Sequence, residues 1–248
     1  LKARPVSTST AIAVCRTIKG VELDIRSTPG TALMNETTGA VIYTPPEGEK
    51  TLRDKLANWE RYIHEAEDID PLIRLAVMHY QFEAIHPFTD GNGRTGRILN
   101  ILYLLHARLL DIPVLYLSSY IVRHKADYYR LLQAVRDEDR WEAWVLYMLQ
   151  AVEHTAAQGI ATIGGIKTAL FDYKHRIRAA YRFYSQDLIN NLFTHPYTKI
   201  EHVQRDLQVS RLTASKYLDA LADGGFVRKL KVGRSNYYVN VALNAVLL

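Results

Sequence analysis

Apolar residues recur every three or four positions along much of the chain, which is the spacing of amphipathic helices. The pattern predicts helices over residues 52–63, 71–85, 92–110, 125–136 and 140–157. The second of these begins with Asp70 as N-cap and Pro71 at the first helical position, and it ends before Pro87. Residues 1–22 have a mixed pattern that predicts no single element. The first part of the chain is therefore expected to be mainly helical.

Turn residues interrupt this helical pattern at two places. Residues 28–49 are rich in proline and glycine and predict loop and hairpin, with residues 40–44 as a strand-like run. Gly159, Gly164 and Gly165 predict a joint, after which residues 166–184 have the pattern of a connecting helix. The chain is therefore expected to change domain after about residue 157.

The last fifty residues have a different texture. Residues 200–207 and 212–222 predict two helices separated by a turn, and residues 226–230 and 237–239 predict two short strands around a basic turn. This order is typical of a winged helix-turn-helix, with residues 212–222 as the recognition helix. We therefore expect three parts, namely a first domain at residues 1–157, a helical linker at 158–198 and a winged helix-turn-helix domain at 199–248.

The composition agrees with one large or two modest globular domains, since the chain has 248 residues, 48% of them hydrophobic and 23% charged. Cys15 is the only cysteine, which excludes an internal disulfide and favours a reducing compartment such as the cytoplasm. The longest apolar stretch, residues 98–110, is shorter than the roughly 20 residues of a membrane helix, so no membrane span is expected. Because the chain begins without Met, we expect an upstream part to be missing.

The formal charge of +5 is unevenly distributed. Residues 1–154 contain 18 basic and 20 acidic groups, whereas residues 155–248 contain 13 basic and 6 acidic groups. A basic C-terminal part favours a nucleic-acid partner, although an ordinary solvated face would have the same composition. DNA and protein partners of the winged helix therefore stay equally open.

Residues 86–97 concentrate the groups that a nucleotide reaction requires. Gly91 and Gly93 stand where a helix begins, so backbone N–H groups can approach phosphate oxygens at the positive end of the helix dipole. Arg94 and Arg97 lie three positions apart on one helix face, and their forked guanidinium groups suit a polyphosphate. Nearby stand a carboxylate and an imidazole, which suit Mg²⁺ and proton transfer near neutral pH; these are Asp90 and His86.

Two other interpretations of this segment were weighed. Residues 91–96 also satisfy the G-x-G-x-x-G dinucleotide fingerprint, but that fingerprint follows a buried strand, whereas residues 80–86 close a helical pattern. A plain glycine turn with solvated arginines would explain each glycine separately. It would not explain why histidine, aspartate, asparagine and two arginines are compressed around the glycines.

The segment matches every fixed position of H-P-F-x-x-G-N-G-R-x-x-R, and the chain thereby resembles the Fic family, whose members mostly transfer AMP from ATP to protein hydroxyls. Further similarity at residues 29–30, 43–46, 82–85, 115–118, 128–129 and 141–144 resembles the bacterial branch with a C-terminal winged helix. The resemblance implies a mainly α fold: a Fic helical core with a β-hairpin flap at residues 1–157, followed by a small α+β winged-helix domain.

The resemblance also implies residue roles. His86 would be the general base for a target Tyr, Thr or Ser hydroxyl, and Asp90 would position Mg²⁺ between the α- and β-phosphates. The residues implied in binding ATP are Gly91, Asn92, Gly93, Arg94, Thr95, Gly96, Arg97, Tyr128 and Tyr129. Because Tyr128 and Tyr129 are adjacent on a helix, one of the two is expected in the core. In the flap, Val41, Ile42 and Tyr43 would pair with the target segment.

Two departures from the family pattern affect these expectations. Relatives contain an inhibitory helix of pattern S/T-x-x-x-E-G/N, which this sequence lacks, so the chain is expected to be uninhibited unless that helix lies upstream or in a partner. Relatives also have an arginine shortly after the Pro-Gly pair, where this chain has residues 31–34 without one.

Several alternatives stay open at the level of function. The same site could transfer another nucleotide, or the chain could be a DNA-binding regulator in which the Fic domain is a sensor. Glycines at 91 and 93 argue against the phosphotransfer variant of the family. Besides the target protein, the partners considered are the chain itself as a substrate of self-modification and a second copy in a homodimer.

Overall fold

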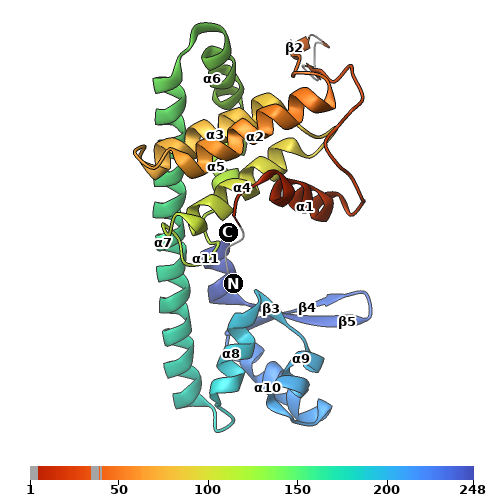
Figure 1. Ribbon diagram of the computed structural model, residues 1–248. Coiled ribbons are helices and arrows are strands. Elements are labelled where there is room, and N and C mark those ends of the chain that lie inside the picture. Colours follow the sequence, from red (N-terminus) through yellow and green to blue (C-terminus); the bar gives the residue numbers. More distant parts are fainter. Residues whose placement is uncertain (1–4, 35–38, 40) are drawn as a thin grey trace. The chain divides into compact units, whose positions relative to one another are not determined.

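A computed structural model describes residues 5–34, 39 and 41–248, which form two compact units, residues 1–157 and 158–248. Each unit has its own hydrophobic core. The elements of the first unit, with a last helix that continues into the second, are α1 (Thr8–Lys19), β1 (Leu33–Met34), β2 (Val41–Tyr43), α2 (Glu49–Glu65), α3 (Pro71–Ile85), α4 (Asn92–His106), α5 (Leu117–Arg123), α6 (Lys125–Glu138) and α7 (Trp141–Ala180) (Figure 1). The mainly helical fold and the β-hairpin are as predicted.

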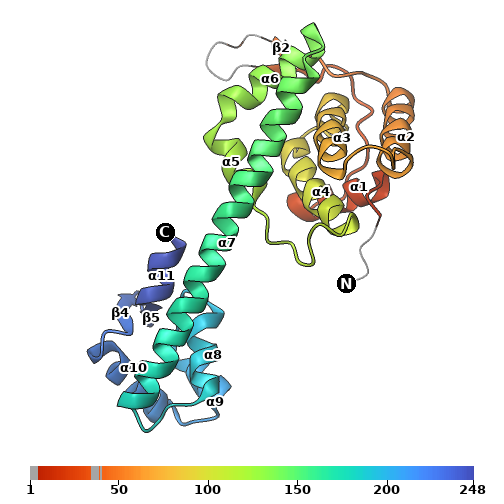
Figure 2. The same ribbon diagram turned by 90° about the vertical axis from the view of Figure 1, so that its left-hand side faces the viewer.

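Helix α3 is the centre of the first unit. It packs between α2 and α4, and α1 lies against α4 and also contacts α2 (Figure 2). Its buried face meets Trp59 of α2 and Trp144 of α7, whose indole N–H groups donate to the backbone carbonyls of Met78 and Ala76. These bonds satisfy the polar atoms of two fully buried indole rings, and they fix the helix that ends at His86.

Helix α1 is an element that the sequence pattern did not predict. Its N-terminus is capped by the Ser7 side chain, which accepts a hydrogen bond from the Thr10 N–H. Its C-terminus is closed by Gly20 at φ +67°, where a side chain would be strained. Ala11 and Cys15, four residues apart, form its buried side. The capping residues and the spacing of Ala11 and Cys15 are the sequence features from which α1 could have been predicted.

Helix α7 contradicts the joint predicted at Gly159, Gly164 and Gly165. The three glycines lie inside one continuous helix of 40 residues. Each interior glycine destabilises a helix by about 1 kcal/mol relative to alanine, which the remaining good helix formers of so long a segment outweigh. Glycine alone was therefore too weak a signal for a break.

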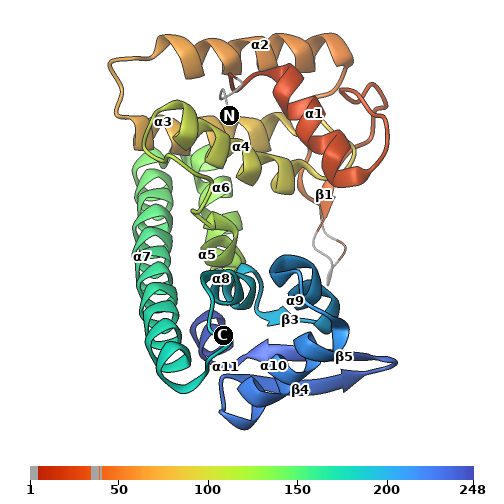
Figure 3. The same cartoon turned by 90° about the horizontal axis from the view of Figure 1, so that it is seen from below.

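The second unit begins in the later part of α7. Its other elements are α8 (Gln186–Thr194), β3 (Tyr197–Thr198), α9 (Ile200–Leu207), α10 (Arg211–Asp223), β4 (Val227–Val232), β5 (Ser235–Asn240) and α11 (Val241–Leu247). The strands form an antiparallel sheet in the order β3-β5-β4 (Figure 3). Two helices and a hairpin thus follow one another as in a winged helix, with α10 packed against β4.

The core of the second unit includes residues from the segment expected to be a linker. Tyr173 and Ile177 of α7 and Leu188 of α8 are buried together with Leu218 of α10. The Tyr173 hydroxyl donates to the Phe226 carbonyl at 2.6 Å and thereby ties α7 to the start of the hairpin. The division of the chain into parts at 1–157, 158–198 and 199–248 stays a prediction. The contacts described here concern packing and do not show which parts fold independently.

Among the described residues, no helix is both long and apolar enough to cross a membrane.

Candidate active site

His86 lies at the C-terminus of α3 in a strained backbone conformation. Its φ is +49°, in the left-handed region that non-glycine residues rarely adopt, and its N–H donates to the Phe82 carbonyl. The ring is partly buried, and Nδ1 is fully buried without a hydrogen-bond partner among the described residues. Burial lowers the pKa of His86 to about 4, although the nearby Glu83 carbonyl opposes this shift. The imidazole is therefore neutral at pH 7 and able to accept a proton.

The N-terminus of α4, which follows His86 after a short loop, is an uncapped helix end. Its N-cap is Gly91, at φ +90°, and among the described residues no side chain accepts a hydrogen bond from the first N–H groups of the helix. Asn92 holds the preceding loop instead, because its amide accepts from the Phe88 N–H at 2.9 Å and donates to the Phe88 carbonyl at 2.7 Å. A rigid loop thus leads to free N–H donors and the positive end of a helix dipole, a good anion site.

Gly96 is required by space within α4, and Gly93 has a close but flexible neighbour. A Cβ at Gly93 would lie 3.1 Å from Nη1 of Arg97, and a Cβ at Gly96 would lie 2.7 Å from Oε1 of Glu83. The latter is closer than real Cβ atoms come to any neighbour. Thr95, between them, is fully buried. The first turn of α4 therefore has no side chain over its N–H groups on one side and is tightly packed against α3 on the other.

The two arginines of the segment have different surroundings. Arg97 is anchored, because its Nε donates to the Ser118 hydroxyl of α5 at 3.0 Å. Arg94 is half-exposed, and its nearest acidic group is Asp90, at 3.7 Å. Both guanidinium groups keep donors that are not committed to protein acceptors, as binding a polyphosphate would require.

Asp90 is the carboxylate next to the uncapped helix end. It forms an ion pair with Lys19 of α1 and accepts a hydrogen bond from the Gly91 N–H at 2.6 Å. These contacts, with that of Lys19 the strongest, lower the pKa of Asp90 and keep it ionised. The described residues contain no cluster of three or more metal-ligating side chains. Asp90 itself is an exposed, ionised carboxylate, which is the ligand type that Mg²⁺ carried on phosphates prefers.

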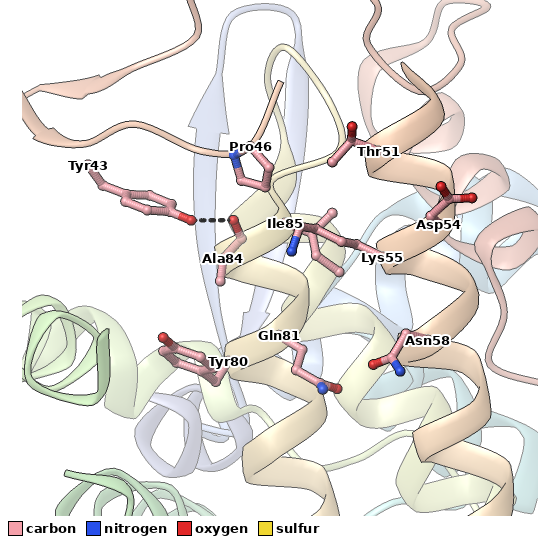
Figure 4. A pocket seen from close by; sticks show the side chains of 10 residues that line it. All are labelled: Tyr43, Pro46, Thr51, Asp54, Lys55, Asn58, Tyr80, Gln81, Ala84 and Ile85. Atoms are coloured by element: carbon pink, nitrogen blue, oxygen red, sulfur yellow. Dashed lines mark hydrogen bonds between the residues drawn. The ribbon is translucent and has the colours of Figure 1, made fainter. Parts of the chain in front are cut away.

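The flap is the two-stranded hairpin of β1 and β2, in which Leu33 pairs with Tyr43. Val41 and Ile42 are exposed, as strand pairing with a target would require, whereas Tyr43 is held. The Tyr43 hydroxyl donates to the Ala84 carbonyl at 2.7 Å (Figure 4), and the Arg136 guanidinium of α6 lies 3.3 Å from the centre of its ring. Ala40, part of the predicted strand, lies outside the described residues.

Two cavities adjoin the flap. The larger, about 450 Å³, lies between the end of the flap, α2 and α3, and Tyr43 and Ala84 are at its edge (Figure 4). No residue of the 86–97 segment lines it. The smaller, about 30 Å³, is lined by residues of the flap and α6 together with Glu83, one helical turn before His86. The smaller cavity therefore adjoins the candidate reaction centre.

Tyr128 and Tyr129 face different surroundings, as their adjacent positions on α6 require. Tyr128 is buried, and its hydroxyl lies 2.9 Å from Nε2 of His79. Tyr129 is exposed and lines the small cavity below the flap. Of the pair, only Tyr129 is accessible to a ligand near the flap, since the cavity itself has room for about one water molecule.

Three residues near the site had no role in the sequence predictions: Lys19, Arg26 and Glu83. Lys19 was missed together with α1, because its partner Asp90 is 71 residues away in the chain. Glu83 is recognisable only from the fold, where burial raises the pKa of its carboxyl to about 7. Arg26 is 4% exposed, and nothing in its sequence context indicates that it is buried.

Comparisons with known proteins agree with this geometry. Residues 12–104 match the model of the Fic/DOC family, and residues 171–243 match the C-terminal domain of SoFic-like protein adenylyltransferases. Residues 12–104 are thus similar to the Fic/DOC domain, as the resemblance of the 86–97 segment predicted. Residues 171–243 are similar to the C-terminal domain of SoFic-like protein adenylyltransferases.

Named relatives are similar over parts of the chain. The Caenorhabditis elegans protein adenylyltransferase fic-1 is 36% identical over 101 residues, which are 41% of this chain and 18% of that protein. A probable protein adenylyltransferase of Aquifex aeolicus is 38% identical over 77 residues, 31% of this chain and 23% of that protein. The matched segments thus span about a fifth of these relatives.

A solved structure supports the fold. The crystal structure of a Fic family protein from Desulfovibrio desulfuricans G20 aligns with a TM-score of 0.58 at 19% identity. The alignment covers 96% of this chain and 70% of that one. At this identity the likeness concerns the fold alone.

Proposed function

We propose that this chain is a protein adenylyltransferase that transfers AMP from ATP to a Tyr, Thr or Ser hydroxyl of a target protein and releases pyrophosphate. The observation that carries the proposal is the uncapped N-terminus of α4, with two arginines on its first turns and a neutral imidazole at the end of α3. The names of the relatives support the adenylyl transfer.

In the proposed reaction, His86 accepts the proton of the target hydroxyl while the hydroxyl oxygen attacks the α-phosphorus. Since Nδ1 is buried, Nε2 is the nitrogen that takes the proton. The bond from the α-phosphorus to the bridging oxygen breaks, and pyrophosphate takes the electron pair. The N–H groups of Asn92 and Gly93 and the guanidinium of Arg94 stabilise the charge that develops on the phosphates, while the Gly91 N–H holds the Asp90 carboxylate.

Two further groups hold the triphosphate in this proposal. Arg97, anchored on Ser118, binds the terminal phosphates, and Asp90 would hold the Mg²⁺ that ATP carries. Bound Mg²⁺ would neutralise phosphate charge and polarise the α-phosphorus. Thr95 and Gly96 shape the first turn, and Tyr129 adjoins the nucleoside, whereas buried Tyr128 acts through packing. The exposed Val41 and Ile42 pair with the target segment.

The experiment supplies the purified protein with ATP labelled at the α-phosphate, Mg²⁺ and a cell extract as the source of targets. Label on protein is expected with the native chain and its loss, by about 10²–10⁴-fold, with His86→Ala. His175→Ala is the matched control, because His175 is exposed and belongs to the second unit. Equal labelling by His86→Ala and the native chain would refute the assignment of the base.

Label transferred from γ-labelled ATP would instead indicate phosphotransfer. Equal labelling from α-labelled UTP or GTP would show that the site transfers nucleotides without a preference for adenine. Label on the chain itself would identify self-modification. Location in the cytoplasm and formation of a homodimer remain part of the proposal and are tested by fractionation and by mass in solution.

A second candidate function is DNA binding by the winged helix. The observation that favours it is a set of exposed cations without ion-pair partners among the described residues, namely Arg211, Lys216, Arg228, Lys231 and Arg234. Lys229 differs, because it pairs with Asp219. Such cations would neutralise phosphates, so affinity for duplex DNA should fall steeply with salt. A mobility shift over a salt series tests this, and no shift at low salt would leave a protein partner.

A further inference from the structure

Arg26, in the segment between α1 and the flap, is a buried cation close to the candidate base. It is only 4% exposed, a rare state for arginine, and has no ion-pair partner among the described residues. Burial lowers its pKa. One of its terminal nitrogens, Nη1, is buried without any hydrogen-bond partner among those residues. A cation in this state costs stability, so packing alone does not account for its presence.

The remaining donors of Arg26 bind the backbone on both sides of the site. Its Nε donates to the His86 carbonyl at 2.8 Å, and Nη2 donates to the Pro46 carbonyl at 2.6 Å. Its own backbone N–H donates to the Pro87 carbonyl at 2.9 Å. One residue thus holds two successive carbonyls of the catalytic segment together with the chain that leads from the flap to α2.

These bonds fall where the backbone needs support. His86 has φ +49°, and a non-glycine residue adopts this conformation only where the surroundings hold it. As the last residue before Pro87, its carbonyl lies beyond the helical hydrogen-bond pattern of α3. The planar fork of a guanidinium can satisfy this carbonyl and a second one at a fixed angle, which a lysine ammonium cannot do in the same way.

We infer that Arg26 is a positioning residue for His86: it fixes the backbone of the base and couples it to the root of the flap at Pro46. The inference deepens the proposed function, because it concerns the residue assigned there as the base. Arg26 does not touch the reacting atoms in this account, and it acts through His86.

The charge of Arg26 gives the inference a second readout. Burial and the Arg26 cation both lower the pKa of His86, whereas the Glu83 carbonyl and the charge of the Asp90 carboxylate raise it. Removing the cation should therefore move the titration of His86 upward. A residue that served packing alone would leave this titration unchanged.

The first experiment measures the titration of the histidine rings by NMR in ring-labelled protein, with the His86 signal assigned by its loss in His86→Ala. In Arg26→Met the pKa of His86 should rise by roughly half a pH unit or more, whereas Arg26→Lys, which keeps the charge, should leave it low. Arg53→Met is the matched control, because Arg53 is an exposed arginine paired with Asp24 and Glu49. An unchanged titration in folded Arg26→Met would overturn the inference.

The second experiment measures transfer from α-labelled ATP. Arg26→Lys should lower kcat about tenfold or more with little change in the KM for ATP, since the base is displaced while the phosphate site is kept. A native kcat in Arg26→Lys would overturn the positioning role, and this variant decides the matter if Arg26→Met does not fold. If the native chain transfers no label at all, the proposed function fails, while the titration still tests Arg26.

Discussion

Glu83 and His79 are titratable groups that α3 carries into the interior of the first unit. Burial raises the pKa of Glu83 to about 7 and lowers that of His79 to about 3, and the nearby Arg97 cation shifts both downward. Oε1 of Glu83 and Nδ1 of His79 are buried without partners among the described residues. At pH 7 the interior thus holds a neutral imidazole and a carboxyl that is partly protonated. The two groups affect stability in opposite directions as pH changes.

Replacing Glu83 with Gln should change the pH dependence of stability. Between pH 4.5, the ordinary pKa of a glutamate, and about pH 7, the unfolded chain loses the proton of the Glu83 carboxyl and the folded chain keeps it. The contribution of Glu83 to the stability of the native chain is therefore present below pH 4.5 and lost as pH rises through 7. The free energy of unfolding of Glu83→Gln, relative to that of the native chain, should therefore be roughly 1–3 kcal/mol higher at pH 8 than at pH 5. Urea unfolding at both values measures this.

His79 and His86 act in the other direction in both proteins. Their lowered pKa values contribute stability above pH 6.5 that is lost as pH falls toward 4, and the substitution at 83 leaves this trend in place. Equal differences between the two proteins at pH 5 and pH 8 would show that the carboxyl of Glu83 is not neutral in the folded chain.

Gly96 is a residue at which packing outweighs helix propensity. Alanine favours a helix by about 1 kcal/mol over glycine, but a methyl group here would meet Glu83 at 2.7 Å and His79 and Phe82 at 3.2 Å. Gly96→Ala should therefore lower the free energy of unfolding by about 1–3 kcal/mol. Denaturant unfolding tests this, and a stabilised variant would mean that α3 and α4 are less closely packed than described.

Among the elements, α7 shows how far one helix can tolerate glycine. Added methyl groups at Gly159 and Gly164 would meet nothing within 4 Å, whereas one at Gly165 would lie 2.9 Å from Cγ1 of Val246. The three positions therefore form a matched set within one helix. Substitutions at Gly159 and Gly164 report the conformational cost of glycine in a helix, whereas a substitution at Gly165 also reports the close packing of α7 against α11.

Gly159→Ala and Gly164→Ala should each raise the free energy of unfolding by about 0.4–1 kcal/mol, because alanine reduces the freedom of the unfolded chain. Gly165→Ala should instead lower it, because Val246 must move. Thermal unfolding followed by circular dichroism measures all three. Stabilisation by Gly165→Ala would indicate that α11 does not pack tightly on α7.

The flap is an element whose position depends on contacts distant in sequence. Tyr43 is held by a hydrogen bond to α3 and by the guanidinium of Arg136 on α6, so the hairpin is fixed at one end while Val41 and Ile42 stay exposed. Arg26 binds the same segment three residues later, at Pro46. The root of the flap is therefore tied to the helix that carries the base.

At the scale of the whole molecule, two hydrophobic cores share one continuous helix. All three tryptophans, Trp59, Trp141 and Trp144, belong to the first unit, so tryptophan fluorescence reports on that unit alone, whereas circular dichroism reports on both. Two separate cores with a helical connection are expected to unfold as separate cooperative units.

Leu218→Ala tests this separation. Leu218 is fully buried in the second core, and its truncation should cost about 2–5 kcal/mol there. The transition followed by circular dichroism should shift to lower temperature in part, while the transition followed by fluorescence stays in place. Leu99→Ala, buried in the first core, is the converse control. A shift of both signals by Leu218→Ala would mean that α7 makes the two units one cooperative system.

The sequence alone determined α2, α3, α4, α6 and the first part of α7, the hairpin, the C-terminal helix-turn-helix and the segment of residues 86–97, because periodicity, caps and a compressed motif are local properties, but it did not predict α5. It did not determine α1, the continuity of α7 or the roles of Lys19, Arg26 and Glu83. The ion pair of Lys19 with Asp90 and the hydrogen bond of Arg26 with His86 join residues 71 and 60 positions apart. Such contacts depend on how elements pack, and burial then sets the pKa values of His86 and Glu83. Only the tertiary structure decides these features.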